Sequence, residues 1–289
     1  MLLGTILLLA LNLTVTRYIL THGFRPLAYA TVRYGLAAVV FAAITIGAER
    51  TLKIARRDLP LVGAAALAIL VNQICFVYAI KTTTASVVAL VLGATPIFAA
   101  LLGLALKTES LSRRFWIGAA VSFGGVALVA AGSGGQLSGD LGGVLLAILT
   151  AATWAAYSVA ITPLMRSYSP SRISSLVLAA GWVGIALSGA GQSRAQDYAL
   201  GWRIWAILVF STLGPLVLTN MLWFRALHRI GPARATLAAN LQPFVAAVFA
   251  LVLLSETITA IQVAGGVCIG AGILAARRAP ATPTPPAGE

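Results

Sequence analysis

The sequence predicts an all-α polytopic membrane protein, with ten transmembrane helices arranged as two inverted five-helix repeats. Three observations support this fold class. They are a very apolar composition, ten apolar runs of membrane-spanning length, and a duplicated apolar pattern in which the basic residues lie at opposite ends of the matching helices. The chain has 289 residues, of which 60% are hydrophobic and 9% are charged, and its mean hydropathy is +0.95. Soluble domains carry about 25% charged residues. Most of this surface must therefore face lipid.

The predicted spans follow one another along the chain with short connections. The first two are residues 1–16 and about 26–48, and the second of these contains Arg33. The first run has neither a basic n-region before it nor a small-residue cleavage site, so we expect a span rather than a signal peptide. The other eight contain no charge and have 20 to 25 residues each: 59–80, 82–106, 115–139, 141–165, 173–193, 204–224, 235–255 and 257–276. A helix needs about 20 residues to cross the hydrocarbon core.

Two stretches align without a gap at an offset of 147 positions. They are GATPIFAALLGLALKTE, residues 93–109, and NLQPFVAAVFALVLLSE, residues 240–256. The alignment pairs Pro96 with Pro243, and each stretch ends in a glutamate. Each half of the chain therefore contains five spans, and because five is odd, the second copy must enter the membrane upside down. We expect repeats at residues 1–132 and 140–277 and a disordered cytoplasmic tail at 278–289.

The basic residues support the inversion. Five lie on loops assigned to one side of the membrane: Arg17, Arg25, Lys81, Arg194 and Arg203. Fourteen lie on the loops and tail assigned to the other side: Arg50, Lys53, Arg56, Arg57, Lys107, Arg113, Arg114, Arg166, Arg172, Arg225, Arg229, Arg234, Arg277 and Arg278. Cytoplasmic loops are enriched in Lys and Arg. The net charge of +13 is thus interpreted as topology rather than nucleic-acid binding, with both termini in the cytoplasm of a multi-pass protein of the cell inner membrane.

Inverted repeats with interrupted helices are typical of secondary transporters, whose sites lie near the bilayer midplane. Proline removes a backbone hydrogen bond, so Pro96 and Pro243 predict interruptions at equivalent depths. A simple packing kink is the alternative for each proline. Polar and aromatic side chains also gather in the first, third, fourth, sixth, eighth and ninth spans. The predicted cavity residues are Asn12, Asn72, Tyr78, Thr95, Pro96, Trp154, Tyr157, Ser158, Asn220, Trp223, Asn240, Gln242 and Pro243.

Two other interpretations of these residues remain open. Asn and Gln also join helices through hydrogen bonds, and Trp and Tyr mark the membrane interface. Arg33 either extends its charge to the interface or contacts a carboxylate of the substrate.

Several classes of function are disfavoured by what the spans lack. No acidic residue falls at midspan, which argues against a proton relay through a buried carboxylate, and no phosphate-binding G-x-x-x-x-G-K-[ST] loop is present. Cys75 and Cys268 lack metal-ligand spacing, so we expect no cofactor and no metal. An enzyme would need a convergent set of catalytic groups, and none is evident. A channel or scaffold remains a less favoured alternative.

Several stretches resemble a known family. ASVVALVLGATPIFAALLGLALKTESLS and WFRALHRIGPARATLAANLQPFVAAVFALVLLSETIT are similar to the two EamA repeats of the drug/metabolite transporter superfamily. The resemblance covers nearly the whole chain and implies a ten-span exporter that works by alternating access. Within the family, the chain looks most similar to the YddG-type exporters of aromatic amino acids and related metabolites.

These observations together predict a secondary transporter. We expect it to export or exchange small metabolites, with aromatic or hydrophobic amino acids as the favoured class, through a central cavity. The alternative is a broad-specificity drug or metabolite efflux carrier coupled to protons. The expected partners are a small-molecule substrate and the lipid bilayer, with no nucleic acid and no obligate protein partner.

Overall fold

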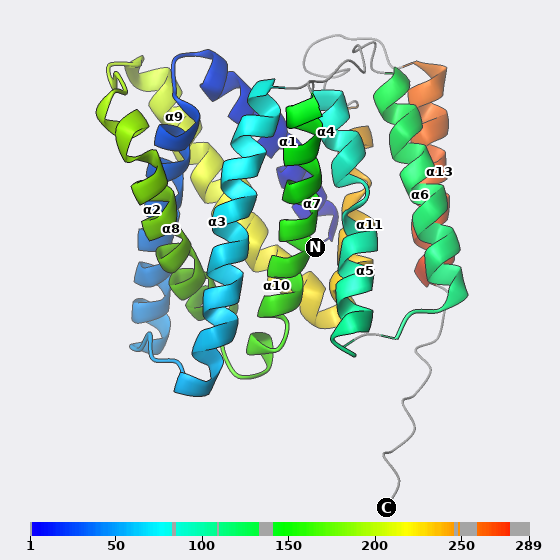
Figure 1. The fold of residues 1–289 in the computed structure, drawn as a ribbon, viewed down its shortest axis with the longest axis horizontal. Coiled ribbons are helices and arrows are strands. Elements are labelled where there is room, and N and C mark those ends of the chain that lie inside the picture. The colour runs from blue at the N-terminus through cyan, green and yellow to red at the C-terminus, as the bar shows by residue number, and fades with distance from the viewer. Residues whose placement is uncertain are drawn as a thin grey trace, which may run out of the picture.

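The computed structural model describes residues 2–82, 85–108, 110–132, 141–245, 248 and 259–277. Within these ranges the chain forms helices and contains no strand (Figure 1). The glutamates that end the two matching stretches, Glu109 and Glu256, lie outside the described residues, as does the predicted tail at 278–289.

The helices follow the order of the predicted spans. The first half contains α1 (Leu2–Thr21), α2 (Pro26–Glu49), the short turn η1 (Arg56–Asp58), α3 (Leu59–Thr82), α4 (Ala85–Leu92), α5 (Thr95–Ala105) and α6 (Arg113–Gly132). The second half contains α7 (Leu141–Ile161), η2 (Leu164–Arg166), α8 (Pro170–Arg194), α9 (Gly201–Thr212), the π-helical η3 (Leu213–Leu218), α10 (Thr219–Ile230), α11 (Pro232–Ala239) and α13 (Ala260–Arg277).

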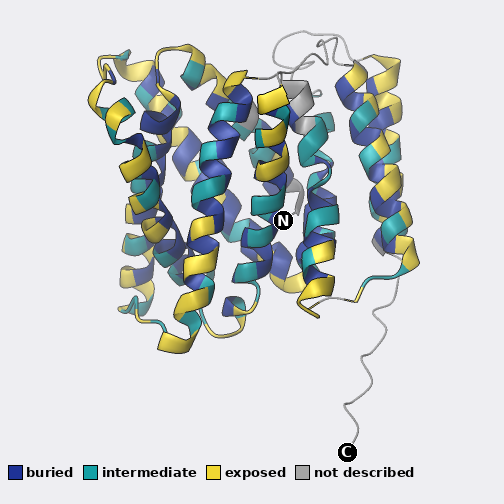
Figure 2. Cartoon of the chain, in the orientation of Figure 1, coloured by how far each residue is buried: buried dark blue, intermediate teal, exposed yellow. Residues whose placement is uncertain are grey.

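Among the described residues, seven helical segments are long and apolar enough to cross a membrane. The predicted number of ten is therefore supported only in part. The apolar helices Leu90–Ala105 and Ala260–Ala276 are shorter, and the span predicted at 235–255 continues into residues that the structure does not describe. The outer surface suits lipid, since Leu187, Val267 and Leu67 are 74%, 66% and 61% exposed. Figure 2 shows such exposed positions along the outer faces of the bundle.

The closest helix pairs each join one helix from either half of the chain. The main pairs are α6 with α13, α2 with α8, and α3 with α7, while α1 packs on α9 and α10. The loops after α2, α5, α7 and α10 lie at one end of the bundle, at the bottom of Figure 1, and those after α1 and α8 lie at the other. The paired helices α2 and α8 therefore run in opposite directions.

Glycines allow α6 and α13 to approach at backbone distance. A Cβ added to Gly118 would lie 2.5 Å from the carbonyl oxygen of Gly272, and one added to Gly125 would lie 2.6 Å from that of Gly265. Small residues let membrane helices pack this closely. The repeat offset relates Gly118 to Gly265 and Gly125 to Gly272, so the crossing uses equivalent positions from both copies.

The α2–α8 pair is joined at both ends by side chains that satisfy helix termini. At the start of α8, Ser169 accepts a hydrogen bond from the Arg172 amide at 3.1 Å, and Glu49 of α2 accepts from the side chains of both. At the start of α2, Gln192 accepts from the Leu27 amide at 2.9 Å, and Gln196 accepts from that of Arg25 at 2.7 Å. The first amides of a helix have no partner within it; α8 is capped by its own Ser169, which Glu49 holds in place, whereas the start of α2 is capped by side chains at the end of α8 and just after it.

Two helices of the bundle are interrupted at equivalent positions. The chain turns at Gly93 and Ala94 between α4 and α5, where Pro96 occupies the first turn of α5. After α11 it turns at Asn240 and Leu241, and helical structure resumes immediately before Pro243. A third irregularity, η3, contains Pro215, and its counterpart in the first half, α3, is a continuous helix. π-helical segments within α-helices occur frequently at functional sites.

Candidate functional site

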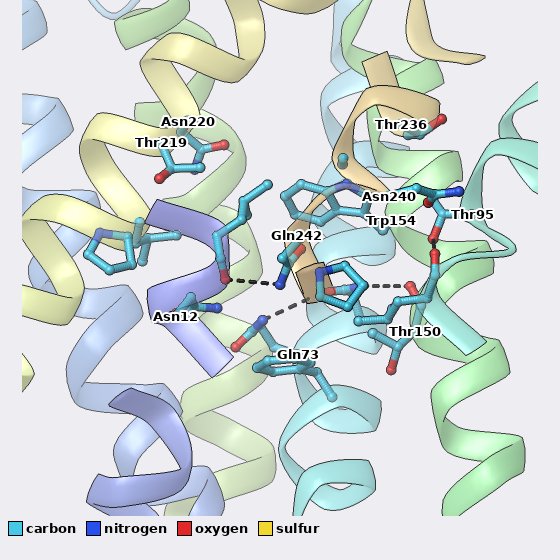
Figure 3. A pocket seen from close by; sticks show the side chains of 18 of the residues that line it. Asn12, Gln73, Thr95, Thr150, Trp154, Thr219, Asn220, Thr236, Asn240 and Gln242 are labelled. Atoms are coloured by element: carbon cyan, nitrogen blue, oxygen red, sulfur yellow. Dashed lines mark hydrogen bonds between the residues drawn. The ribbon is translucent and has the colours of Figure 1, made fainter. Parts of the chain in front are cut away.

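A cavity of about 120 Å³ lies between the two halves of the chain. Its wall is built from α1, α2, α3, α7 and α10, from η3, and from the interruptions that follow α4 and α11. Figure 3 shows Asn12, Gln73, Trp154 and Gln242 reaching into this region from four different elements. The prolines at positions 96 and 243 therefore mark interruptions beside a cavity.

The structure brings most of the predicted site residues together. Those in the cavity wall are Asn12, Arg33, Asn72, Thr95, Trp154, Asn220, Asn240, Gln242 and Pro243. They come from both repeats, although they are separated by as many as 231 positions in the sequence.

Four of the remaining predicted residues lie behind the wall or at the end of the bundle. Tyr157 is fully buried, and its hydroxyl donates to Asn220 Oδ1 at 3.2 Å. Trp223 is also buried, and its Nε1 lies 3.4 Å from Ser158 Oγ. Tyr78 lies apart from these residues and accepts a hydrogen bond from Gln192 Nε2 at 2.7 Å. These side chains support the wall or join helices.

Pro96 is likewise absent from the cavity wall. It is buried in the first turn of α5. Its second-repeat counterpart, Pro243, does line the cavity.

Other wall residues are not among the predicted site residues. They are Leu9, Tyr34, Gln73, Phe76, Leu92, Gly93, Thr150, Pro215, Leu216, Thr219, Thr236 and Ala239. Gln73 and Thr150 carry a usable signal, since each is a polar side chain well inside an apolar run, whereas Thr236 lies at the start of the run at 235–255. The apolar members have no such signal, because almost every position of these spans is apolar.

Amide groups join α3 to α7 at the cavity. Asn72 Nδ2 donates to the carbonyl oxygen of Thr150 at 2.8 Å and lies 3.4 Å from Thr153 Oγ1. Gln73 Nε2 lies 3.5 Å from Asn72 Oδ1, and Gln73 Oε1 is buried without a hydrogen-bond partner among the described residues. The wall therefore contains a free acceptor.

Arg33 is buried within the bundle, with 2% of its surface exposed. Its Nη2 donates to Asn12 Oδ1 at 2.6 Å and to the Ser211 carbonyl oxygen at 3.1 Å. Its guanidinium carbon lies 5.7 Å from the centre of the Tyr29 ring. Arg33 Nε has no partner, and no ion pair to Arg33 occurs among the described residues. A buried charge normally needs a partner, and the charge of Arg33 has no anionic partner among the described residues.

The second interruption contacts the first repeat through two amides. Asn240 Nδ2 lies 3.1 Å from the Gly93 carbonyl oxygen and 3.1 Å from Ser122 Oγ. Gln242 Nε2 donates to the carbonyl oxygen of Leu9 in α1 at 2.9 Å, the contact drawn in Figure 3. Asn240 and Gly93 are equivalent under the repeat offset of 147, so the two interruptions touch each other.

The described residues form no group of three His, Cys, Asp or Glu side chains that could hold a metal ion. Cys75 and Cys268, which lie in different helices, are free thiols. The side chains in the wall offer hydrogen bonds, one positive charge and aromatic surface. They suit binding of a small amphipathic molecule.

Comparison with known proteins identifies the family. The profile of the EamA-like transporter family matches residues 1–131 and again residues 141–278. The chain belongs to the EamA-like transporter family. It is therefore a multi-pass membrane transporter of the drug/metabolite transporter superfamily, and the predicted resemblance to the two EamA repeats is confirmed.

Two other likenesses agree with this family membership. The chain is 23% identical over 282 residues to the uncharacterized transporter YyaM of Bacillus subtilis (strain 168), a match that covers 96% of this chain and 92% of YyaM. A protein of known crystal structure has the same fold, with a TM-score of 0.77, 18% identity and 96% coverage of both chains. EamA transporters move small molecules through a membrane, and the similarity to YddG-type exporters in particular stays a prediction.

Proposed function

We propose that this EamA transporter is a secondary carrier that exports or exchanges small metabolites across the cell inner membrane by alternating access. Aromatic and hydrophobic amino acids are the favoured substrates, and both termini lie in the cytoplasm. The central cavity between the repeats is the substrate site. The interruptions after α4 and α11 allow this wall to rearrange between the two access states.

The observation that supports this substrate class most directly is the pair of unsatisfied polar atoms in the wall. Arg33 Nε is a buried donor with a positive charge, and Gln73 Oε1 is a buried acceptor. A substrate carboxylate satisfies the first, and a substrate ammonium satisfies the second. Phe76, Tyr34 and Trp154 line the same cavity and provide apolar surface for a hydrophobic side chain.

Exchange or downhill export is favoured over proton-coupled efflux. The wall contains no Asp, Glu or His among the described residues, and these are the side chains that proton relays in pumps use. Proteoliposomes with an imposed pH gradient test this point. Amino-acid counterflow that is insensitive to the gradient is the expected result, whereas accumulation that follows the gradient supports the proton-coupled alternative.

The substrate assignment is tested by counterflow of radiolabelled phenylalanine, tryptophan and leucine in proteoliposomes. We expect Arg33→Gln to lower kcat/KM by roughly tenfold or more, because a hydrogen bond to a charged group contributes about 1.5–3 kcal/mol. In Arg33→Gln, inhibition of counterflow by unlabelled phenylalanine should weaken. Inhibition by phenylalanine amide, which lacks the carboxylate, should not weaken. Arg17→Gln is the control, since Arg17 is exposed on α1. Absence of counterflow for every amino acid contradicts the proposal, and so does a kcat/KM that Arg33→Gln leaves unchanged.

A further inference from the structure

A second cavity, of about 590 Å³, lies where the ends of helices from both repeats meet. It is lined by the segment after α5, the end of α7 with the turn after it, and the junction between α10 and α11. Four of its side chains are basic, and we call this cavity the basic vestibule: Lys107, Arg166, His228 and Arg234. It is distinct from the central cavity, with which it shares no lining residue.

The positive charge of the vestibule is not neutralised by the described residues. The two ion pairs among them, Arg57 with Asp58 and Arg172 with Glu49, involve none of the vestibule residues. Arg234 Nε is buried without a hydrogen-bond partner. Glu109 is next to the lining in sequence, but its single negative charge leaves at least two of the three Lys and Arg charges unbalanced.

The vestibule and the central cavity share two helices in their walls. On α11, Arg234 lines the vestibule and Thr236 lines the central cavity. On α7, Val159 lines the vestibule and Trp154 the central cavity, a separation of about 7.5 Å along the helix axis at 1.5 Å per residue. The two cavities are therefore less than two helical turns apart along these helices.

The vestibule also lies at the end of the bundle that carries most of the basic loops. The loops after α2, α5, α7 and α10 are grouped there, at the bottom of Figure 1. The excess of Lys and Arg in cytoplasmic loops assigns this end to the cytoplasm. An exporter collects its substrate from that side.

We propose that the basic vestibule is the cytoplasmic docking site for the carboxylate of the transported solute, and that binding there strengthens as the net negative charge of the solute increases. The inference rests on the proposed carrier function. Its physical basis is that clefts lined by one sign of charge raise the local concentration of oppositely charged solutes and their association rate. The guanidinium groups of Arg166 and Arg234 match the planar geometry of a carboxylate.

Two solutes of nearly the same shape test the charge preference. Phenylalanine is zwitterionic at neutral pH, and phenylpyruvate keeps the aromatic ring and the carboxylate but carries net negative charge. In counterflow, the double variant Lys107→Gln/Arg166→Gln should raise KM for phenylpyruvate at least about fivefold with kcat unchanged, and should raise KM for phenylalanine less. Arg229→Gln is the matched control, because Arg229 is exposed on α10 outside the vestibule.

Thiol labelling tests the vestibule without transport. In a Cys75→Ala/Cys268→Ala background, Thr162→Cys places a thiol in the vestibule wall. An anionic methanethiosulfonate should react faster than a cationic one, and phenylpyruvate should slow the reaction. Both effects should diminish in Lys107→Gln/Arg166→Gln and at about 1 M salt, where the Debye length is about 3 Å.

The outcomes separate this inference from the carrier proposal. An unchanged KM for phenylpyruvate in the double variant, or labelling rates that do not depend on reagent charge, contradicts the docking role of the basic vestibule. Either result leaves the carrier proposal unaffected. Absence of counterflow in the wild type instead refutes the carrier proposal. In that case, labelling that phenylpyruvate does not slow overturns the vestibule as well.

Discussion

The two interrupted helices have the same backbone plan but different polar chemistry. In the first repeat, Thr95 Oγ1 donates to the Leu92 carbonyl oxygen at 2.6 Å, within the same segment. A continuous helix would supply that carbonyl with the amide of residue 96, and Pro96 has none. The Thr95 hydroxyl therefore replaces the missing donor locally. At the Leu92 carbonyl oxygen, the first interruption supplies its own donor.

In the second repeat, the equivalent polar side chains bind elsewhere. Gln242, the counterpart of Thr95, donates to Leu9 in α1, and Asn240, the counterpart of Gly93, donates to Gly93 itself. Duplication has kept the proline and the turn, while the amides that connect an interruption to the other repeat occur in the second copy. We conclude that the polar contacts at the interruptions depend mainly on the second copy.

The largest effect should come from Asn240→Leu. This change leaves the Gly93 carbonyl oxygen and Ser122 Oγ, both parts of one buried contact, without their donor. An unsatisfied buried polar group costs about 1–3 kcal/mol, so we expect a stability loss of about 2 kcal/mol in thermal unfolding of the detergent-solubilised protein. A loss below about 0.5 kcal/mol means that Asn240 does not join the interruptions.

An intermediate effect is expected for Gln242→Leu. The lost bond to the Leu9 carbonyl oxygen is single and half-buried, and that oxygen lies within α1, where the helix supplies another donor. We expect a loss of about 1 kcal/mol, close to the average for one hydrogen bond. The same unfolding measurement checks it, and a loss equal to that of Asn240→Leu contradicts the ranking.

The smallest effect should follow Thr95→Val, which removes the local hydroxyl and keeps the shape of the side chain. Leu92 lines the central cavity, where water can take the place of the lost donor. We expect a loss of under about 1 kcal/mol in the same assay. A loss larger than that of Gln242→Leu indicates that the first interruption is not self-sufficient.

The sequence predicts the plan of the bundle because lipid leaves few alternatives. Apolar runs without charge must be helices, and the ungapped offset of Pro96 and Pro243 locates both interruptions. The family match confirms the duplication. The number of spans is less secure, since α4 with α5 is divided and residues after 245 include stretches that the structure does not describe.

Side-chain direction is much less predictable than helix position. In a soluble helix, the alternation of polar and apolar faces indicates which side is buried, but a lipid-facing helix is apolar all round. Tyr157 and Trp154 both lie in α7 with their rings 5.5 Å apart, yet Trp154 lines the cavity and Tyr157 lies behind it. The sequence likewise does not predict the η3 segment at Pro215, because Ala68 stands at the equivalent position of the first repeat and the pair of prolines is lacking there.

The hydrogen bonds that join α2 and α8 at both ends limit how the bundle can change shape. Displacing one helix along the other by a single turn, about 5.4 Å, would strip Leu27 of its acceptor at one end and separate Glu49 from Arg172 at the other. Both losses would occur in the same step. These two helices should therefore travel as a rigid unit, so that Arg33 and Tyr34, which α2 contributes to the cavity wall, move together with α8 when the cavity opens.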